Sequence, residues 1–334
     1  MKKLRLRTKI ETILVSFLLL SIAAATVISV TRIISDTHDD IDTFIRNTNG
    51  NYWDVSEANL QQALWDLNNS NGGTVWVGGD LTLTSPIRMG NNQKDSYENV
   101  ILDFLGNTVT MGADVDFLYM QSCRYCQVKN VYINLIDNYA SDILHLHVAA
   151  GGNQNRIRFN LFENIHVNEH GSTGLYYNGI HIDGDGTANV AMNTFRKITF
   201  ELSRAGIYID WDSTSYVNGN VFSDIFVPGA YVTVEFERNS GNVAQNYFEH
   251  VYGDADSNTY YGFANISNED NQFYNCFIWD WNGRNPNASP YDWIVDATAT
   301  GTTIISNHIF NLLDNGHNTL AYSGNSGWLG DRAP

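Results

Sequence analysis

Short segments in which apolar and polar residues alternate follow one another through most of the chain. The pattern begins at TVWV (74–77) and LTLT (81–84) and returns in GIHID (179–183) and GIYID (206–210). Strict alternation over a few residues is typical of β-strands with one buried face, and no segment after residue 73 has a convincing helical period. The sequence therefore predicts an all-β domain built from many short strands.

One helical pattern precedes these strands. Ser56 can cap a helix, and the apolar residues Leu60, Ala63, Leu64 and Leu67 follow with the spacing of a single helix face. Asn-Gly-Gly at 71–73 then favours a turn. We expect one short amphipathic helix at the start of the β-domain.

A repeated frame runs from residue 160 onward: Asn, any residue, Phe, two variable residues and an apolar residue. Its phenylalanines are 33, 27, 26 and 25 residues apart, and an earlier segment fits with Cys126 in the asparagine place. Repeats of this length are typical of a solenoid, whose coils stack because one coil cannot bury its apolar face alone. We expect a buried column of phenylalanines and a hydrogen-bonded ladder of asparagines. These residues are Phe162, Phe195, Phe222, Phe248 and Phe273, with Asn160, Asn193, Asn220, Asn246 and Asn271.

The helix followed by GGTVWVGGDLTLTSPI and NVILDFLGNTVTM resembles the start of proteins of the pectin lyase-like superfamily. The resemblance covers about residues 53–313 and implies a right-handed parallel β-helix whose first coil is capped by a short helix. That fold carries lyases, hydrolases, epimerases, phage tailspikes and non-enzymatic surface proteins, so the resemblance specifies architecture rather than chemistry.

The N-terminus predicts export. Basic residues precede an uncharged run, 13–30, that as a helix would span about 27 Å, near the thickness of a bilayer core. Ala23-Ala24-Ala25 offers a cleavage site, so the segment is either a removed signal peptide or a signal anchor, and the rest is extracellular or at the cell surface. We divide the chain into this segment (1–33), a linker (34–52), the parallel β-helix (53–313) and a C-terminal tail (314–334).

Charge and cysteine content limit the classes of partner. The net charge is −17, and five of the 19 basic residues lie in the first eleven positions. Such an acidic surface repels nucleic acid and anionic lipid, so a membrane partner enters only through an uncleaved N-terminal helix. Cys123 and Cys126 have the spacing of half a zinc site that nothing nearby completes, and we interpret them as a local pair or buried thiols.

Three successive repeats end on pairs of carboxylates: HIDGD (181–185), YIDWD (208–212) and TVEFE (233–237). Alternation turns the residues between the buried Ile and Val side chains outward, and stacking coils about 4.8 Å apart aligns them in columns. His145 and His147 fall on the same face one coil earlier. The predicted columns are His181, Tyr208 and Thr233; Asp183, Asp210 and Glu235; and Asp185, Asp212 and Glu237.

This acidic face has three open interpretations: a solvated surface, a Ca²⁺ site, or an acid–base site on a polysaccharide. The Ca²⁺ ligands would be Asp183, Asp185, Asp210 and Asp212. The catalytic residues would be Asp183, Asp210, Asp212 and His181. The substrate-binding residues would be Tyr208, Glu235 and Glu237, together with the outward tryptophans Trp279 and Trp281.

The sequence thus predicts an extracytoplasmic β-helix protein directed at an extracellular polysaccharide or glycan. The leading hypothesis is a glycoside hydrolase or lyase, slightly ahead of binding without catalysis. The alternative is a non-enzymatic structural or adhesive surface protein of the tailspike-like kind. Ca²⁺ is the one cofactor considered, and the sequence leaves the oligomeric state open.

Overall fold

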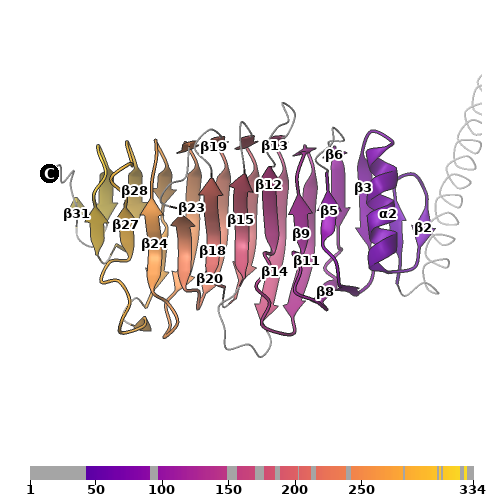
Figure 1. Ribbon diagram of the computed structural model, residues 1–334, viewed down its shortest axis with the longest axis horizontal. Helices are drawn as coiled ribbons and strands as arrows, with labels where there is room; N and C mark the ends of the chain where they lie inside the picture. Colours follow the sequence, from indigo (N-terminus) through magenta and orange to yellow (C-terminus); the bar gives the residue numbers. More distant parts are fainter. Residues whose placement is uncertain are drawn as a thin grey trace, which may run out of the picture. The chain divides into compact units, whose positions relative to one another are not determined.

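A computed structural model describes residues 43–90, 97–148, 156–169, 177–184, 189–201, 203–211, 216–237, 242–280, 283–306, 308–309, 311–323 and 327–328. Within these ranges strands predominate and α2 (Glu57–Asn68) is the only helix. The all-β prediction is confirmed, and stacked parallel sheets give the architecture of a β-helix-like solenoid (Figure 1). The predicted export segment (1–33) lies outside the described residues, and within them no helix is long and apolar enough to cross a membrane.

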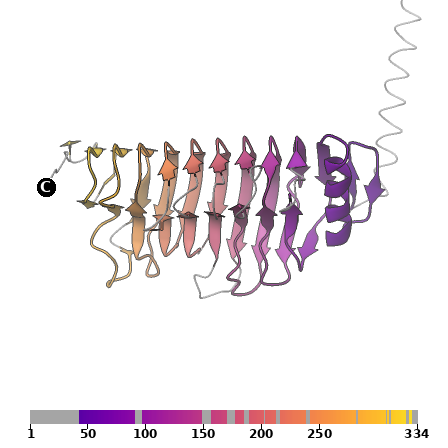
Figure 2. The same cartoon turned by 45° about the horizontal axis from the view of Figure 1, so that its top comes forward.

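Three sheets run along the stack of coils, and neighbouring strands come from successive coils (Figure 2). The nine-stranded sheet comprises β5 (Ile87–Met89), β9 (Leu118–Met120), β12 (Leu144–Val148), β15 (Asn178–Gly184), β18 (Ala205–Trp211), β21 (Val232–Phe236), β24 (Tyr261–Ile266), β27 (Trp293–Val295) and β29 (Leu312–Asp314). The six-stranded sheet comprises β6 (Tyr97–Glu98), β10 (Cys123–Arg124), β13 (Arg156–Arg158), β16 (Asn189–Ala191), β19 (Tyr216–Asn218) and β22 (Asn242–Ala244).

The sixteen-stranded sheet covers the remaining side of each coil and includes the ends of the stack. Its strands are β1 (Ile45–Asn47), β2 (Tyr52–Trp53), β3 (Gly73–Val77), β4 (Leu81–Leu83), β7 (Val100–Asp103), β8 (Thr108–Met111), β11 (Gln127–Leu135), β14 (Leu161–Glu169), β17 (Thr194–Phe200), β20 (Val221–Pro228), β23 (Tyr247–Asp254), β25 (Gln272–Tyr274), β26 (Phe277–Trp279), β28 (Thr303–Ser306), β30 (Leu320–Ser323) and β31 (Gly327–Trp328). Most neighbours pair in parallel; β1 pairs antiparallel with β2 and β3, and β30 antiparallel with β31.

The fold extends beyond the predicted domain boundaries. Strand β1 buries Ile45 and Asn47 against β3, although we assigned this segment to a linker. Strand β30, in the predicted C-terminal tail, pairs with β28 and buries Ala321. These short strands lie outside the clear repeats, so the periodicity of the sequence does not mark them.

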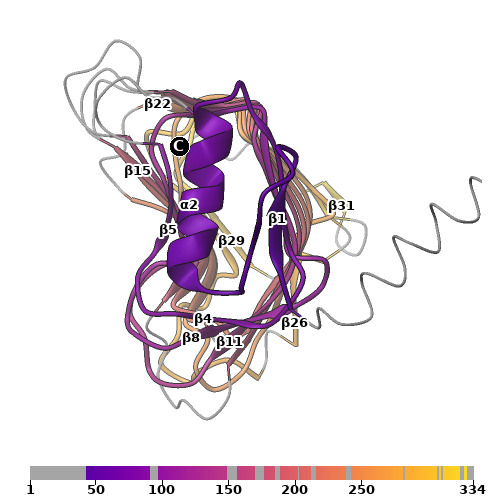
Figure 3. The same cartoon turned by 90° about the vertical axis from the view of Figure 1, so that its right-hand side faces the viewer.

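The capping helix is confirmed. Ser56 Oγ accepts a hydrogen bond from the backbone N–H of Asn59 at 3.2 Å, which satisfies a donor in the first helical turn. The predicted apolar face is fully buried, and Figure 3 shows the helix lying across the first coil. The helix therefore covers the apolar end of the stack, which would otherwise face solvent.

The predicted phenylalanine column and asparagine ladder are both present. Successive Phe rings from Phe162 to Phe273 stack with centroids 4.4–4.9 Å apart and planes within 10° of parallel. Each asparagine from Asn160 to Asn246 donates its side-chain N–H to Oδ1 of the next one along the stack. Cys126 occupies the asparagine place one coil earlier, and its backbone N–H donates to Asn160 Oδ1 at 2.9 Å. The coils are thus held in one register.

Candidate functional site

The outward residues of the nine-stranded sheet form two columns, which we call the polar strip. Alternation places them between fully buried residues such as Ile180 and Ile182. The first column is Arg88, Tyr119, His145, His181, Tyr208 and Glu235. The second is His147, Asp183 and Asp210, and the pairing of Ile209 with Phe236 sets Glu237 next in line. The prediction that both histidines of ILHLHV share this face is confirmed.

The register between β18 and β21 differs from our prediction by two residues. We expected Thr233 beside Tyr208 and Glu235 beside Asp210, whereas Glu235 pairs with Tyr208. A shift of two residues keeps every side chain on its own face, so alternation alone cannot distinguish the two registers.

The facing sheet explains the observed register. Gly206 lies where an added Cβ would be 2.5 Å from Val227, so that place needs a residue without a side chain. In the next coil Thr233 takes the same place and is buried. There the facing residue is Gly253, whose hydrogen leaves room for the threonine. Thr233 is therefore a core residue, not a member of the polar strip.

His145 lies at the centre of the polar strip between two carboxylates. Its Nδ1 is 2.9 Å from Asp116 Oδ2, and its Nε2 is 3.1 Å from Asp183 Oδ1. Burial alone would lower the pKa of His145, but these two hydrogen bonds outweigh it and raise the pKa to about 10. Burial likewise opposes ionisation of Asp183, yet the hydrogen bonds from His145 and His147 bring its pKa well below the usual range. The Asp183 carboxylate and the His145 imidazolium therefore form an ion pair.

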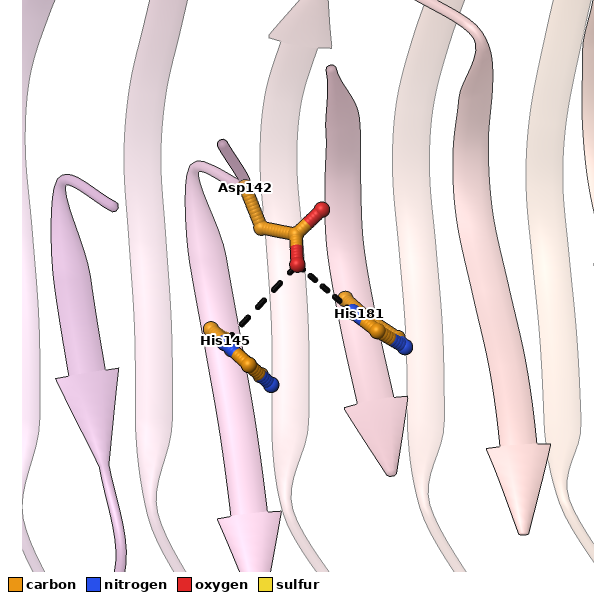
Figure 4. A group of neighbouring side chains, drawn as sticks. All are labelled: Asp142, His145 and His181. Atoms are coloured by element: carbon orange, nitrogen blue, oxygen red, sulfur yellow. Dashed lines mark hydrogen bonds and ion pairs between the residues drawn. The ribbon is translucent and has the colours of Figure 1, made fainter. Parts of the chain in front are cut away.

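A third carboxylate, that of Asp142, orients the His181 ring and lies near the His145 ring. Asp142 Oδ2 is 2.6 Å from His181 Nδ1 and 3.8 Å from His145 Nδ1 (Figure 4). The two rings lie 4.8 Å apart and within 10° of parallel, one above the other along the stack. His181 Nε2 is buried and has no hydrogen-bond partner among the described residues.

A hydrogen-bonded chain connects this cluster to the next coils. Asn178 Nδ2 donates to Asp142 at 2.8 Å, and its Oδ1 accepts from Arg204 at 2.9 Å. The other end of the Arg204 guanidinium donates to Glu235 Oε2 at 2.9 Å. The guanidinium also lies 4.4 Å from the centre of the Tyr208 ring. Arg204 thus joins the histidine end of the strip to its carboxylate end.

A cleft of about 570 Å³ opens beyond Glu235. Its lining combines tyrosine rings, one guanidinium and one carboxylate with a few apolar atoms: Arg204, Tyr231, Glu235, Tyr261, Ala264, Asn265 and Ile294. Burial raises the pKa of Glu235; Arg204 opposes this rise and the neighbouring Glu237 adds to it. Tyr208 donates its hydroxyl to Glu237 Oε2 at 2.7 Å, so the two glutamates are held apart by different partners.

The structure brings together part of the predicted site. Asp183, Asp210, His181, Tyr208, Glu235 and Glu237 all belong to the polar strip or its continuation. Trp279 is half exposed, but it lies on β26 of the sixteen-stranded sheet, whereas the polar strip belongs to the nine-stranded sheet. Asp185, Asp212 and Trp281, which were also predicted as site residues, lie outside the described residues. Asp183 accepts from two imidazoles, unlike the carboxylates of a Ca²⁺ site with oxygen ligands only.

Sequence reasoning missed Asp116, Asp142 and Arg204. All three lie just before their strands, in turns where period-2 alternation has ended. The one available signal was an aspartate two positions before the first residue of two successive strands, Asp116 before Leu118 and Asp142 before Leu144; Arg204 directly precedes Ala205 and shows no such signal. No protein-family model matches the chain, and no curated protein matches it in sequence.

Proposed function

We propose that this protein binds an extracellular glycan in the cleft beside Glu235 and hydrolyses a glycosidic bond there by acid–base catalysis. The observation that carries the proposal is a carboxyl group with a raised pKa, Glu235, at a tyrosine-lined cleft and one strand from the exposed carboxylate of Asp210. Pairs of carboxyl groups whose environments differ in this way supply the acid and the base of glycosidases.

The cleft has the chemistry that sugar rings need. Tyr231 stacks on Tyr260 with centroids 4.7 Å apart and meets Tyr261 edge-on at 5.8 Å, so these rings support one another. Aromatic faces bind the apolar faces of sugars, and the phenol groups and the Arg204 guanidinium donate hydrogen bonds to hydroxyls. The strip is rich in carboxylates, which favours a neutral glycan over a polyanionic one.

Register sets the spacing of the proposed acid and base. Adjacent strands lie about 4.8 Å apart and residues two positions apart about 6.6 Å, so the Cα atoms of Asp210 and Glu235 are about 8 Å apart, and side chains that extend outward in parallel keep their carboxyl groups at a similar separation. Inverting glycosidases hold their carboxyl groups about 6.5–9.5 Å apart to admit a water molecule. Glu235 then protonates the leaving oxygen, and Asp210 takes a proton from the attacking water. Hydrolysis with inversion follows.

The resemblance to right-handed pectin lyase-like β-helices and the predicted export segment complete the proposal. Both favour a polysaccharide outside the cytoplasm as the substrate. The alternative is a structural or adhesive protein that binds a glycan without cleaving it, or binds none.

A panel of neutral and acidic polysaccharides tests the proposal. The full-length protein is incubated with each, and reducing ends and the absorbance of unsaturated products are followed separately. We expect new reducing ends without unsaturation, and weaker binding by Tyr231→Ala and Tyr261→Ala than by Tyr132→Ala, an exposed tyrosine on the sixteen-stranded sheet. Unsaturated products would indicate a lyase. Binding without cleavage would indicate the adhesive alternative. The absence of both binding and cleavage would contradict a glycan-directed role.

A further inference from the structure

We propose that His145, His147 and Asp183 form a binding site for a divalent transition-metal ion of the Zn²⁺ type. The three side chains come from two adjacent strands of the nine-stranded sheet, β12 and β15, and extend from the same outward face. Their ligand atoms lie within 4.8 Å of one another. Two imidazoles and one carboxylate are a common set of three protein ligands for zinc.

The distances between donor atoms agree with this assignment. Asp183 Oδ1 lies 3.1 Å from His145 Nε2 and 2.8 Å from His147 Nδ1. Zinc–nitrogen bonds of about 2.0–2.1 Å in tetrahedral geometry place neighbouring ligand atoms about 3.3 Å apart. Small side-chain rotations therefore suffice to admit an ion.

The outer contacts of His145 are those of a metal-binding histidine. Its Nδ1 is 2.9 Å from Asp116 Oδ2 and donates to that carboxylate, so a metal ion that displaces the Nε2 proton of the imidazolium binds the Nε2 lone pair on the side of Asp183. Asp116 is itself held, because its other oxygen accepts the backbone N–H of Asp142 at 2.9 Å. Histidine–carboxylate pairs of this kind fix the tautomer and the ring orientation at metal centres.

Ring geometry distinguishes this set from a second one nearby. Asp142, His145 and His181 also gather three ligand atoms, but the two imidazoles are stacked 4.8 Å apart and within 10° of parallel (Figure 4). An imidazole lone pair lies in the ring plane, so an ion in the plane of one stacked ring is out of the plane of the other. The planes of His145 and His147 differ by 71°, which allows both lone pairs to meet at one point.

The ligand types and the exposure of the site define the ion. Imidazole nitrogens favour Zn²⁺ and its first-row neighbours over Ca²⁺, which takes oxygen ligands. His147 and Asp183 are each about a quarter exposed on their side chains, at 21% and 27%. Three protein ligands facing solvent leave a fourth position for water or another ligand.

Equilibrium dialysis of the full-length protein, produced without a histidine tag, against ZnCl₂ tests the site. We expect one zinc ion per chain in the parent and at least tenfold weaker binding in His147→Gln and Asp183→Asn. Asp116→Asn should weaken binding about 10–100-fold through the orientation of His145. The matched control is His250→Gln, because His250 has a single carboxylate partner, Asp224, on another sheet.

Two further measurements keep the result unambiguous. Zinc should raise the melting temperature of the parent but not of His147→Gln, whereas CaCl₂ should raise neither. His181→Gln should retain zinc. Zinc binding that is absent, or equal in the parent and in folded His147→Gln, would overturn the site. Loss of zinc in His181→Gln with retention in Asp183→Asn would overturn the ligand set. Either result leaves the proposed hydrolysis untouched, because that reaction uses Glu235 and Asp210.

Discussion

Arg204 donates to Glu235 Oε2 at 2.9 Å while its guanidinium lies 4.4 Å from the centre of the Tyr208 ring. The same group donates to Asn178 one coil earlier, so one side chain fixes polar residues from three successive coils. A solvated acidic face would not need such an arrangement. Arg204 holds Glu235 at the mouth of the cleft, and burial keeps the pKa of the Glu235 carboxyl raised although Arg204 opposes the rise.

The neighbours of Glu235 predict shifts in the pH profile of glycan cleavage. A general acid must be protonated, so kcat/KM falls as pH rises through the raised pKa of Glu235. Arg204 lowers that pKa and Glu237 raises it. Arg204→Gln should therefore move the alkaline limb of the profile to higher pH, and Glu237→Gln should move it to lower pH. Shifts in the same direction, or none, would argue against Glu235 as the acid.

The asparagine ladder should carry a large share of the stability of the stack. In Asn220→Ala, Oδ1 no longer accepts the backbone and side-chain N–H groups of Asn193, and the buried Val190 carbonyl loses a donor. Buried groups left unpaired cost about 1–3 kcal/mol each, so we expect a loss of at least about 2 kcal/mol in the free energy of unfolding. Denaturant unfolding measures it. Asn242→Ala, an exposed residue of β22, should change the same quantity by less than about 0.5 kcal/mol.

The phenylalanine column gives a second measure of stability. Phe222 is fully buried between Phe195 and Phe248, with ring centroids at 4.9 and 4.7 Å. Truncation to alanine leaves a cavity that neighbouring coils cannot close, so Phe222→Ala should cost about 3–5 kcal/mol. Phe226, on the same strand but 37% exposed, provides the control. Equal losses from the two truncations in denaturant titrations would show that the column does not hold the coils together.

The three cysteines should be unreactive in the folded protein. All three are free and fully buried, and burial raises the pKa of Cys276 to about 12. The thiolate is the reactive form, so a thiol reagent should modify none of them at neutral pH until the protein unfolds, after which all three should react. Rapid labelling of a thiol in the native protein would contradict this. Reducing agents should leave the melting temperature unchanged.

The sequence allowed the core to be predicted more fully than the site. The Phe and Asn frames repeat because each coil must bury the same face and satisfy the same turn, so Phe222 and Asn220 were found from spacing alone. Alternation also placed His145 and His181 on one face. It could not set the β18–β21 register, because that depends on Thr233 facing Gly253 in another sheet. Alternation could not identify Asp116 either, because its contact is with His145, a residue 29 positions later in the next coil.

The most direct test of the central claim compares cleavage and binding of one glycan by Glu235→Gln. The amide keeps the size of the side chain but cannot donate a proton as an acid does, so turnover should fall by about 10²–10⁴-fold while glycan affinity stays close to that of the parent. Glu249→Gln, on β23 of the sixteen-stranded sheet, should cleave as the parent does. Parental turnover in folded Glu235→Gln would contradict the account.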